Sequence, residues 1–323
     1  METDAHERGT DRDRIAGTLL AAAAGDALGA GYEFQRPPFG EIAMIGGGLG
    51  PFAPGEWTDD TSMAICIAEV TATGDLDLDA IGERFLAWAR SGPKDIGTST
   101  GAVLRDADRG GDLSEAAARY HARHPRGAAG NGALMRTAPV ALAHLGDDAA
   151  LSDAARDVAL LTHADPLAGD ACVLWCVAID RAIGDLRLDG VWDGLALLPL
   201  ERRGFWHDAL TAAETDPAGR FVPNGFTVTA LQAAYAAVAQ TPVPDDVPSR
   251  HLEVALDAAV RVGDDTDTVA AIAGGLLGAR WGASAVPDHW RDLLHGWPGL
   301  RATDLIRLAI RTASGAGPRT EPG

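Results

Sequence analysis

The sequence predicts an all-α protein, a compact globule of many helices, and two observations support this. Alanine recurs in blocks such as LLAAAAGDALGA, SEAAARYHARH and VAAIAGGLLGA, and alanine in quantity favours helix and lets helix axes approach closely. No run of four or more β-branched or aromatic residues alternates with polar ones, and aromatic residues make up only 6% of the chain. The sequence therefore gives no sound basis for a strand.

Taken in order, the helical stretches are separated by short segments rich in Gly, Pro and Asp, which end one helix before the next begins. Helices are expected at 14–30, 60–73, 79–90, 98–108, 114–124, 133–145, 151–162, 167–183, 206–214, 228–239, 251–261, 268–282 and 301–313. So many helices cannot pack as one four-helix bundle. Two of them, 167–183 and 268–282, are almost entirely apolar, so we expect them at the centre of the globule.

The helices are expected to form a single domain over residues 14–313, because no segment between them has the composition of an interdomain linker. The proline-rich stretch 241–249 is explained more simply as a surface loop. Residues 1–13 are highly charged, and residues 314–323 have no apolar side chains to bury. Both ends are therefore expected to be disordered.

Composition restricts the classes of partner. The chain has 323 residues, with 27 Lys and Arg against 46 Asp and Glu, a formal net charge of −19. This charge disfavours nucleic-acid backbones and anionic membranes as partners. The longest uncharged stretch, 221–244, contains prolines and polar residues and cannot cross a bilayer. The first residues lack the apolar run of a secretory signal, which indicates a cytoplasmic protein.

Two dense acidic clusters each lead directly into an apolar helix. Thr58-Asp59-Asp60 precedes the stretch SMAICIAEV, and Asp264-Asp265-Thr266-Asp267-Thr268 precedes VAAIAGGLLGA. Helix capping is the simpler explanation, because Asp and Thr accept hydrogen bonds from free backbone N–H groups. One cap needs only one such residue, however, and adjacent buried carboxylates repel one another unless a cation compensates them.

If the two clusters converge, Asp59, Asp60, Asp265 and Asp267 carry four negative charges, which two divalent ions would balance. Thr58 and Thr268 would add neutral oxygen ligands. The clusters contain no His or Cys, and an all-oxygen ligand set selects Mg²⁺ or Mn²⁺ over Zn²⁺ or copper. The sequence thus predicts a dinuclear metal site at helix N-termini, with solvated helix caps as the alternative.

With these residues laid out, the sequence resembles the ADP-ribosylglycohydrolase family, which includes the dinitrogenase-reductase-activating glycohydrolases. The resemblance runs from about residue 14 to residue 283 and rests on six segments in the family's order. They are GTLLAAAAGDALGAGYEF (17–34), PGEWTDDTSMA (54–64), PKDIGTSTGAVL (93–104), GNGALMR (130–136), THADPLAGDACVLWC (162–176) and VGDDTDTVAAIAGGLLGA (262–279).

The resemblance implies an all-helical fold with two Mg²⁺ or Mn²⁺ ions that hydrolyses the bond between C1″ of ADP-ribose and a protein side chain. By motif, the implied metal ligands are Thr58, Asp59, Asp60, Asp265, Asp267 and Thr268, whereas Asp264 precedes the matched D-x-D-T core and is left out. Glu33 matches an acidic residue beside the metals, although on sequence alone it is explained as a solvent-facing loop glutamate. The implied catalytic residues are Glu33, Asp59, Asp60 and Asp267.

Other segments of the resemblance imply contacts with the substrate. Asp95 belongs to a D-I-G segment near the scissile ribose, where a carboxylate can orient a guanidinium by paired hydrogen bonds. His163 resembles a histidine beside the diphosphate ribose, although such a histidine is otherwise usually structural. A short backbone segment that opens a helix can approach a diphosphate closely. The implied substrate-binding residues are Glu33, Asp95, Gly97, Thr98, Gly130, Asn131, Gly132 and His163.

The predicted partner is therefore an ADP-ribosylated protein or a small-molecule ADP-ribose conjugate. Arginine is the expected acceptor because of Asp95. Serine, O-linked derivatives and a non-catalytic ADP-ribose-binding or structural relative are the alternatives. Metal-held ribose oxygens would fix C1″ while an activated water attacks it. The sequence does not decide which carboxylate takes the proton from that water.

Two other patterns are decoys. The run 97–101 (GTSTG) fits a serine-hydrolase nucleophile elbow, but that motif needs a preceding strand, which the sequence does not support. The run 46–50 (GGGLG) lacks the Lys-Ser/Thr of a phosphate-binding loop.

The three cysteines contain no C-x-x-C pair and are expected to be buried packing residues.

Overall fold

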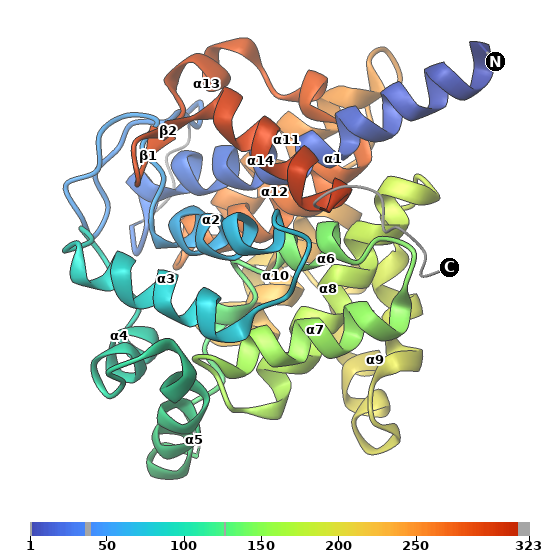
Figure 1. The fold of residues 1–323 in the computed structure, drawn as a ribbon. Coiled ribbons are helices and arrows are strands. Elements are labelled where there is room, and N and C mark those ends of the chain that lie inside the picture. The colour runs from blue at the N-terminus through green and yellow to red at the C-terminus, as the bar shows by residue number, and fades with distance from the viewer. Residues whose placement is uncertain (1, 36–39, 126, 316–323) are drawn as a thin grey trace, which may run out of the picture.

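The computed structural model describes residues 2–35, 40–125 and 127–315, and this part of the chain is almost entirely helical (Figure 1). The α-helices are α1 (Glu2–Gly29), α2 (Asp59–Thr71), α3 (Leu78–Arg90), α4 (Thr98–Arg105), α5 (Leu113–Arg123), α6 (Ala138–Ala143), α7 (Asp148–Leu160), α8 (Pro166–Gly184), α9 (Leu200–Thr215), α10 (Thr227–Ala239), α11 (His251–Arg261), α12 (Thr266–Trp281), α13 (Asp288–Leu293) and α14 (Ala302–Ser314). Short 3₁₀ turns lie between them, including η1 (Ala30–Tyr32), η3 (Asn131–Ala133) and η4 (Gly190–Leu197). The all-α prediction is confirmed.

Each of the thirteen predicted helices has a counterpart, but the bounds of three of them differ substantially. The helix expected at 133–145 is replaced by η3 followed by the short α6, because Pro139 favours the first turn of a helix rather than its interior. The helix expected at 206–214 begins earlier, at Leu200, directly after Pro199. Helix α13 was not predicted at all.

A small hairpin was also missed. Strands β1 (His295–Gly296) and β2 (Leu300–Arg301) pair antiparallel, with His295 opposite Arg301. The hairpin is anchored to the segment before α2, since Trp57 N donates to His295 O at 3.1 Å and His295 N donates to Gly55 O at 3.1 Å. A strand of two residues leaves too short a pattern to be detected in sequence.

The N-terminal segment also differs from the expectation of a disordered arm. Helix α1 begins at Glu2, and its first turns project from the body of the molecule (Figure 1). The last residues of the predicted arm are held in place, because Asp13 accepts hydrogen bonds from Ser284 N at 3.1 Å and Ser284 Oγ at 2.7 Å. At the other end, α14 continues to Ser314, and the rest of the predicted tail from residue 316 lies outside the described residues.

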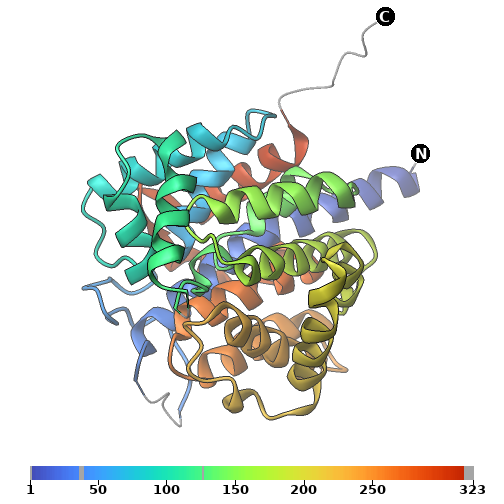
Figure 2. The same cartoon turned by 90° about the horizontal axis from the view of Figure 1, so that it is seen from below.

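The packing of α1 against α12 forms the centre of the fold. A methyl group added at Gly25 would lie 2.1 Å from Ala270 O, and one added at Gly278 would lie 2.0 Å from Gly17 O. The two backbones therefore touch directly, which only glycine permits. Seen from below, α1 enters the molecule between the α12 region and the helices of the first half of the chain (Figure 2).

Around this pair lies one continuous apolar core. It includes α8, whose side chains are almost all buried, as predicted for 167–183. Cys66, Cys172 and Cys176 are free and buried within it, as expected. None of the described helices combines the length and the apolar character needed to span a membrane.

Candidate active site

The two acidic clusters meet in the folded chain at the N-termini of α2 and α12. Carboxylate oxygens of Asp26, Asp60 and Asp267 lie within 4.8 Å of one another, and so do those of Glu33, Asp265 and Asp267. The two groups share Asp267, so they form one continuous acidic cluster. The predicted convergence of turns two hundred positions apart is therefore observed.

Asp26 is the member of this cluster that sequence reasoning missed. It lies on α1, is fully buried, and accepts hydrogen bonds from Thr58 N at 2.9 Å, Thr61 N at 3.0 Å and Thr61 Oγ1 at 2.6 Å. It thereby holds the first turn of α2 in place. Burial raises the pKa of Asp26 to about 6, against the lowering effect of these hydrogen bonds. The signal was available in the sequence, since Asp26 is the only charged residue in an otherwise apolar helical run.

Asp60 and Asp267 have the chemistry expected of metal ligands. Each is buried, and the Oδ1 atom of each has no hydrogen-bond partner among the described residues. Burial first, and then the neighbouring carboxylates, raises the pKa of both side chains well above the usual range. Buried oxygens without donors are costly. These carboxylates could therefore hold a metal ion, and oxygen ligands of this kind are the ones that hard divalent cations prefer.

The other predicted metal ligands surround these two. Thr58 Oγ1 donates to Asp60 Oδ2 at 3.0 Å, and Asp265 and Thr268 lie at the start of α12. Asp264, which was left out of the ligand set, has φ +67 and accepts a hydrogen bond from Asn224 N at 2.7 Å. Asp264 thus shapes the turn before α12.

Glu33, a member of the acidic cluster, is buried and does not face solvent. Its carboxylate accepts a hydrogen bond from Leu49 N at 3.4 Å. Burial, followed by the charges of Asp265 and Asp95, raises the pKa of Glu33 to about 8. Burial and the charge of Asp95 also raise the pKa of Asp59 to about 7, while Gly97 N donates to Asp59 Oδ2 at 3.3 Å. The metal-free protein therefore holds two carboxyl groups that titrate near neutral pH.

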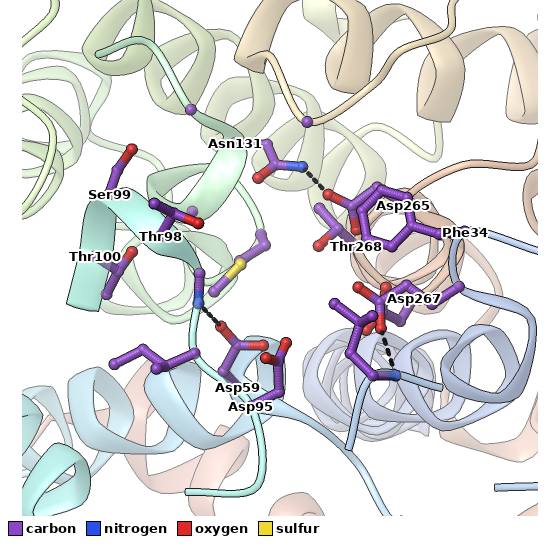
Figure 3. A pocket seen from close by; sticks show the side chains of 18 of the residues that line it. Phe34, Asp59, Asp95, Thr98, Ser99, Thr100, Asn131, Asp265, Asp267 and Thr268 are labelled. Carbon is purple, nitrogen blue, oxygen red and sulfur yellow. Dashed lines mark hydrogen bonds between the residues drawn. The ribbon is translucent and has the colours of Figure 1, made fainter. Parts of the chain in front are cut away.

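A cleft of about 320 Å³ opens above the cluster (Figure 3). Asp59 and Asp95 face Asp265, Asp267 and Thr268 across it, and Thr98 lies on a side wall. The predicted site residues that line the cleft are Glu33, Asp59, Asp95, Gly97, Thr98, Gly130, Asn131, Gly132, His163, Asp265, Asp267 and Thr268. Thr58 and Asp60 are not among the lining residues. Lining residues that sequence reasoning missed are Phe34, Leu49, Ile96, Ser99, Thr100, Met135 and Gly225.

The segment 130–132 contributes in a different way from that expected. It opens the 3₁₀ turn η3 rather than an α-helix, and Asn131 N donates to Gly225 O at 3.1 Å. The N–H of Asn131 is therefore used within the protein. Its side chain donates to Asp265 Oδ2 at 2.8 Å, which ties the segment to the acidic cluster. Gly130 and Gly132 leave room for His163, since added methyl groups would lie 3.2 Å from its Nε2 and 3.0 Å from its Cε1, respectively.

A second cavity of about 520 Å³ adjoins the cleft, and Asp59 and Asp95 line both. Its other walls include the aromatic side chains of Trp57, Trp88 and Trp297 and the missed hairpin. The hairpin is fixed there, since Trp57 Nε1 donates to Trp297 O at 3.2 Å. The two carboxylates thus stand at the boundary between an acidic cleft and an aromatic cavity.

The decoy at 97–101 is not a nucleophile elbow. Residues 91–97 form a loop without a strand, and Ser99 Oγ lies 3.2 Å from the hydroxyl of Tyr120. The acidic side chains, and not a serine nucleophile, are therefore the chemically distinctive groups of the site.

Comparison with known proteins gives one consistent result. The profile of the ADP-ribosylglycohydrolase family matches residues 7–320. The chain is 32% identical to ADP-ribosyl-[dinitrogen reductase] glycohydrolase of Rhodospirillum rubrum, over 87% of this chain and 90% of that protein. It is 30% identical to the ADP-ribosylarginine hydrolase Tri1 of Serratia proteamaculans (strain 568), over 87% of this chain and 75% of that protein. A solved structure titled "ADP-ribosylglycohydrolase-related protein complex" superposes with a TM-score of 0.72 at 28% identity, covering 96% of this chain and all of that one.

Proposed function

The chain belongs to the ADP-ribosylglycohydrolase family, and on this premise we propose that it hydrolyses the C1″ bond between ADP-ribose and a protein arginine side chain with the help of two divalent ions. The observation that carries the proposal is the cluster of buried carboxylates beneath the cleft, in which Asp60 and Asp267 each present an oxygen that has no donor among the described residues. Such a cluster is stable in the folded protein only when cations or protons compensate it.

The proposed ligands of the two ions are Thr58, Asp59, Asp60, Asp265, Asp267 and Thr268. When bound, Mg²⁺ or Mn²⁺ ions supply a Lewis acid that activates water and holds hydroxyl oxygens of the substrate. Asp26 is placed behind them as a positioning residue, because its carboxylate already accepts three hydrogen bonds from the first turn of α2.

Two carboxylates are suited to take the proton from the attacking water. Glu33 and Asp59 both line the cleft, and both have a pKa near neutrality in the metal-free protein. With cations bound nearby, the pKa values of both groups would be lower, and both carboxylates would be ionised and able to accept a proton. Glu33 is the stronger candidate of the two, since Asp59 is also a proposed metal ligand.

Arginine is the proposed acceptor because Asp59 and Asp95 lie where the acidic cleft meets the aromatic cavity. A carboxylate there can hold a guanidinium by paired hydrogen bonds, and the aromatic walls of the second cavity favour the same planar cation. Lys94 also lines this cavity, but it does not compete with the substrate guanidinium for these carboxylates. Its Nζ lies 2.6 Å from Oε2 of Glu56, which neutralises its charge. Two of the relatives that the chain resembles are named for arginine.

The test measures free ADP-ribose released from arginine-, serine- and O-acetyl-linked substrates, with Mg²⁺, with Mn²⁺ and with chelator. The proposal predicts release from the arginine-linked substrate only, and loss of at least about 100-fold in Asp59→Ala, Asp267→Ala or chelator. Release that persists in chelator and in both variants contradicts the metal-dependent mechanism. Turnover of the serine-linked substrate alone contradicts the arginine assignment but leaves the metal site intact.

One further variant addresses the second cavity. Trp297→Ala removes an aromatic wall without touching the acidic cluster. We expect the KM for the arginine-linked substrate to rise about tenfold, with unchanged affinity for free ADP-ribose. The matched control is Trp192→Ala, on η4 outside both cavities.

A further inference from the structure

Arg136 is a fully buried guanidinium without a carboxylate partner in the part of the chain that the structure describes. Its Nη1 lies 3.4 Å from Met63 Sδ, its guanidinium carbon lies 4.4 Å from the centre of the Phe85 ring, and its Nε has no hydrogen-bond partner among the described residues. Burial lowers the pKa of Arg136 to about 10, so the side chain remains charged at neutral pH. An unpaired buried cation is costly and is not explained by packing alone.

The one strong hydrogen bond of Arg136 leads towards the cleft. Its Nη2 donates to Thr162 Oγ1 at 2.7 Å, and the same oxygen lies 2.8 Å from Nδ1 of His163. A guanidinium can only donate, so Thr162 Oγ1 is the acceptor in the first bond. The hydroxyl hydrogen of this buried threonine then has one acceptor within reach among the described residues, namely Nδ1 of His163.

This arrangement fixes the tautomer of the histidine. Because Nδ1 accepts a hydrogen bond, the proton of the neutral ring is on Nε2. His163 is neutral, since burial, reinforced by the charge of Arg136, lowers its pKa to about 3. His163 lines the cleft and lies against Gly130 and Gly132, with no protein acceptor for Nε2 among the described residues. The ring therefore presents an N–H donor to whatever occupies the cleft.

We propose that Arg136 and Thr162 are positioning residues, which hold His163 in its Nε2–H form so that it donates a hydrogen bond to an anionic oxygen of the ligand. The identity of that ligand rests on the proposed function, in which the diphosphate of ADP-ribose supplies the oxygen. The charge of Arg136 polarises the hydrogen bonds from Thr162 to His163. Although Arg136 does not line the cleft, its positive charge also partly offsets the negative charge of the carboxylates there. The chain of donors runs from Arg136 through Thr162 and His163 to the ligand.

The first test needs no ligand and reads the tautomer directly. In ¹⁵N-histidine-labelled protein, we expect the nitrogen shifts of His163 to show a proton on Nε2 and none on Nδ1. Thr162→Ser keeps the hydroxyl and preserves this pattern, whereas Thr162→Val removes it and yields a mixture of tautomers. Thr312→Val is the matched control, because Thr312 is equally buried but lies on α14, where its hydroxyl lies 3.3 Å from Ala68 O. A proton on Nδ1 in the wild-type protein overturns the proposal.

The second test measures the consequence for binding by calorimetry with ADP-ribose and Mg²⁺. Thr162→Val should bind about tenfold more weakly, as expected for one charge-assisted hydrogen bond, and Thr162→Ser and Thr312→Val should bind like the wild type. Equal affinity in Thr162→Val contradicts the positioning role. If the wild-type protein binds no ADP-ribose but shows the Nε2–H tautomer, the proposed function fails while the assignment of the hydrogen-bond chain stands.

Discussion

Asp60 and Asp267 each bury an oxygen that no donor satisfies in the part of the chain that the structure describes, and this determines how substitutions there should behave. Each carboxylate is unfavourable in the metal-free protein and favourable when a cation is bound. We therefore expect Asp267→Asn to raise the free energy of unfolding of chelator-treated protein at alkaline pH by about 1 kcal/mol or more. Mn²⁺ at about a hundredfold above its Kd should stabilise the wild type by about 2.7 kcal/mol for each ion bound and the variant much less. Chemical denaturation with and without Mn²⁺ measures both effects.

Asp170 provides the control, because it is a buried carboxylate with partners of opposite charge. It is fully buried and accepts hydrogen bonds from Arg202 at 2.5 Å and Trp206 Nε1 at 3.2 Å. Asp170→Asn should destabilise the protein by about 3 kcal/mol, equally with and without metal. If Asp267→Asn destabilised the chelated protein in the same way as Asp170→Asn, the carboxylate would be a structural group and not a ligand.

His163 predicts an acid-dependent loss of stability. Its pKa falls from 6.5 to about 3 in the folded protein, so between these values the unfolded chain binds a proton that the folded protein does not. Stability is therefore complete above about pH 6.5 and decreases as the pH falls, by about 1.4 kcal/mol per pH unit. His163→Gln lacks this contribution, so the difference in unfolding free energy between wild type and variant should shrink on acidification. A difference that stays constant on acidification would contradict this prediction.

The roles of single residues could be predicted from the sequence only where a motif marked them. The dense acidic turns stood out because no cap needs so many carboxylates. Asp26 did not stand out, although an aspartate in an apolar helix needs buried donors, and it finds them in the first turn of α2. The partners of Arg136 were beyond prediction, since they come from helices far apart in the sequence.

Between helices, the contact of α1 with α12 sets the distance between Asp26 and Asp267. Gly25→Ala places a methyl group 2.1 Å from Ala270 O, so the two helices must separate. We expect a loss of about 2 kcal/mol or more in the free energy of unfolding, together with weaker Mn²⁺ binding. Both are measured on the same purified variant, by denaturation and calorimetry.

Gly204 on α9 is the matched control for this substitution. It is exposed, and nothing lies within 4 Å of an added methyl group. Gly204→Ala should raise the free energy of unfolding by about 0.5–1 kcal/mol, because alanine is the better helix former. A Gly25→Ala variant as stable as the wild type would show that the close approach of α1 and α12 does not hold the acidic cluster together.

Most helices could be predicted because their signals are local: blocks of alanine form the helices, and segments rich in Gly, Pro and Asp end them. The hairpin of β1 and β2 could not, because its two-residue strands are fixed by hydrogen bonds to residues 55–57, far away in sequence. Charge alone predicts disorder for residues 1–13, whereas Asp13 accepts a hydrogen bond from Ser284 N and the adjacent Arg14 donates to Ile183 O. In each of these cases, tertiary contacts that the sequence does not reveal determined the local structure.

For the molecule as a whole, the net charge of −19 opposes the approach of an anionic ligand. Salt screens this repulsion, since the Debye length falls from about 30 Å at 0.01 M to about 8 Å at 0.15 M. The association rate constant for ADP-ribose should therefore rise severalfold over this range at fixed Mg²⁺. Stopped-flow measurements of the intrinsic tryptophan fluorescence test this. A rate that falls with salt would contradict a governing role of the net charge in the encounter.

The joint metal site at the N-termini of α2 and α12 is tested most directly by anomalous diffraction from crystals grown with Mn²⁺. The expected result is two anomalous peaks about 3.5–4 Å apart, enclosed by Asp59, Asp60, Asp265 and Asp267 and absent in Asp267→Asn. A map of fully Mn²⁺-soaked crystals with no anomalous peak between these carboxylates would contradict the account.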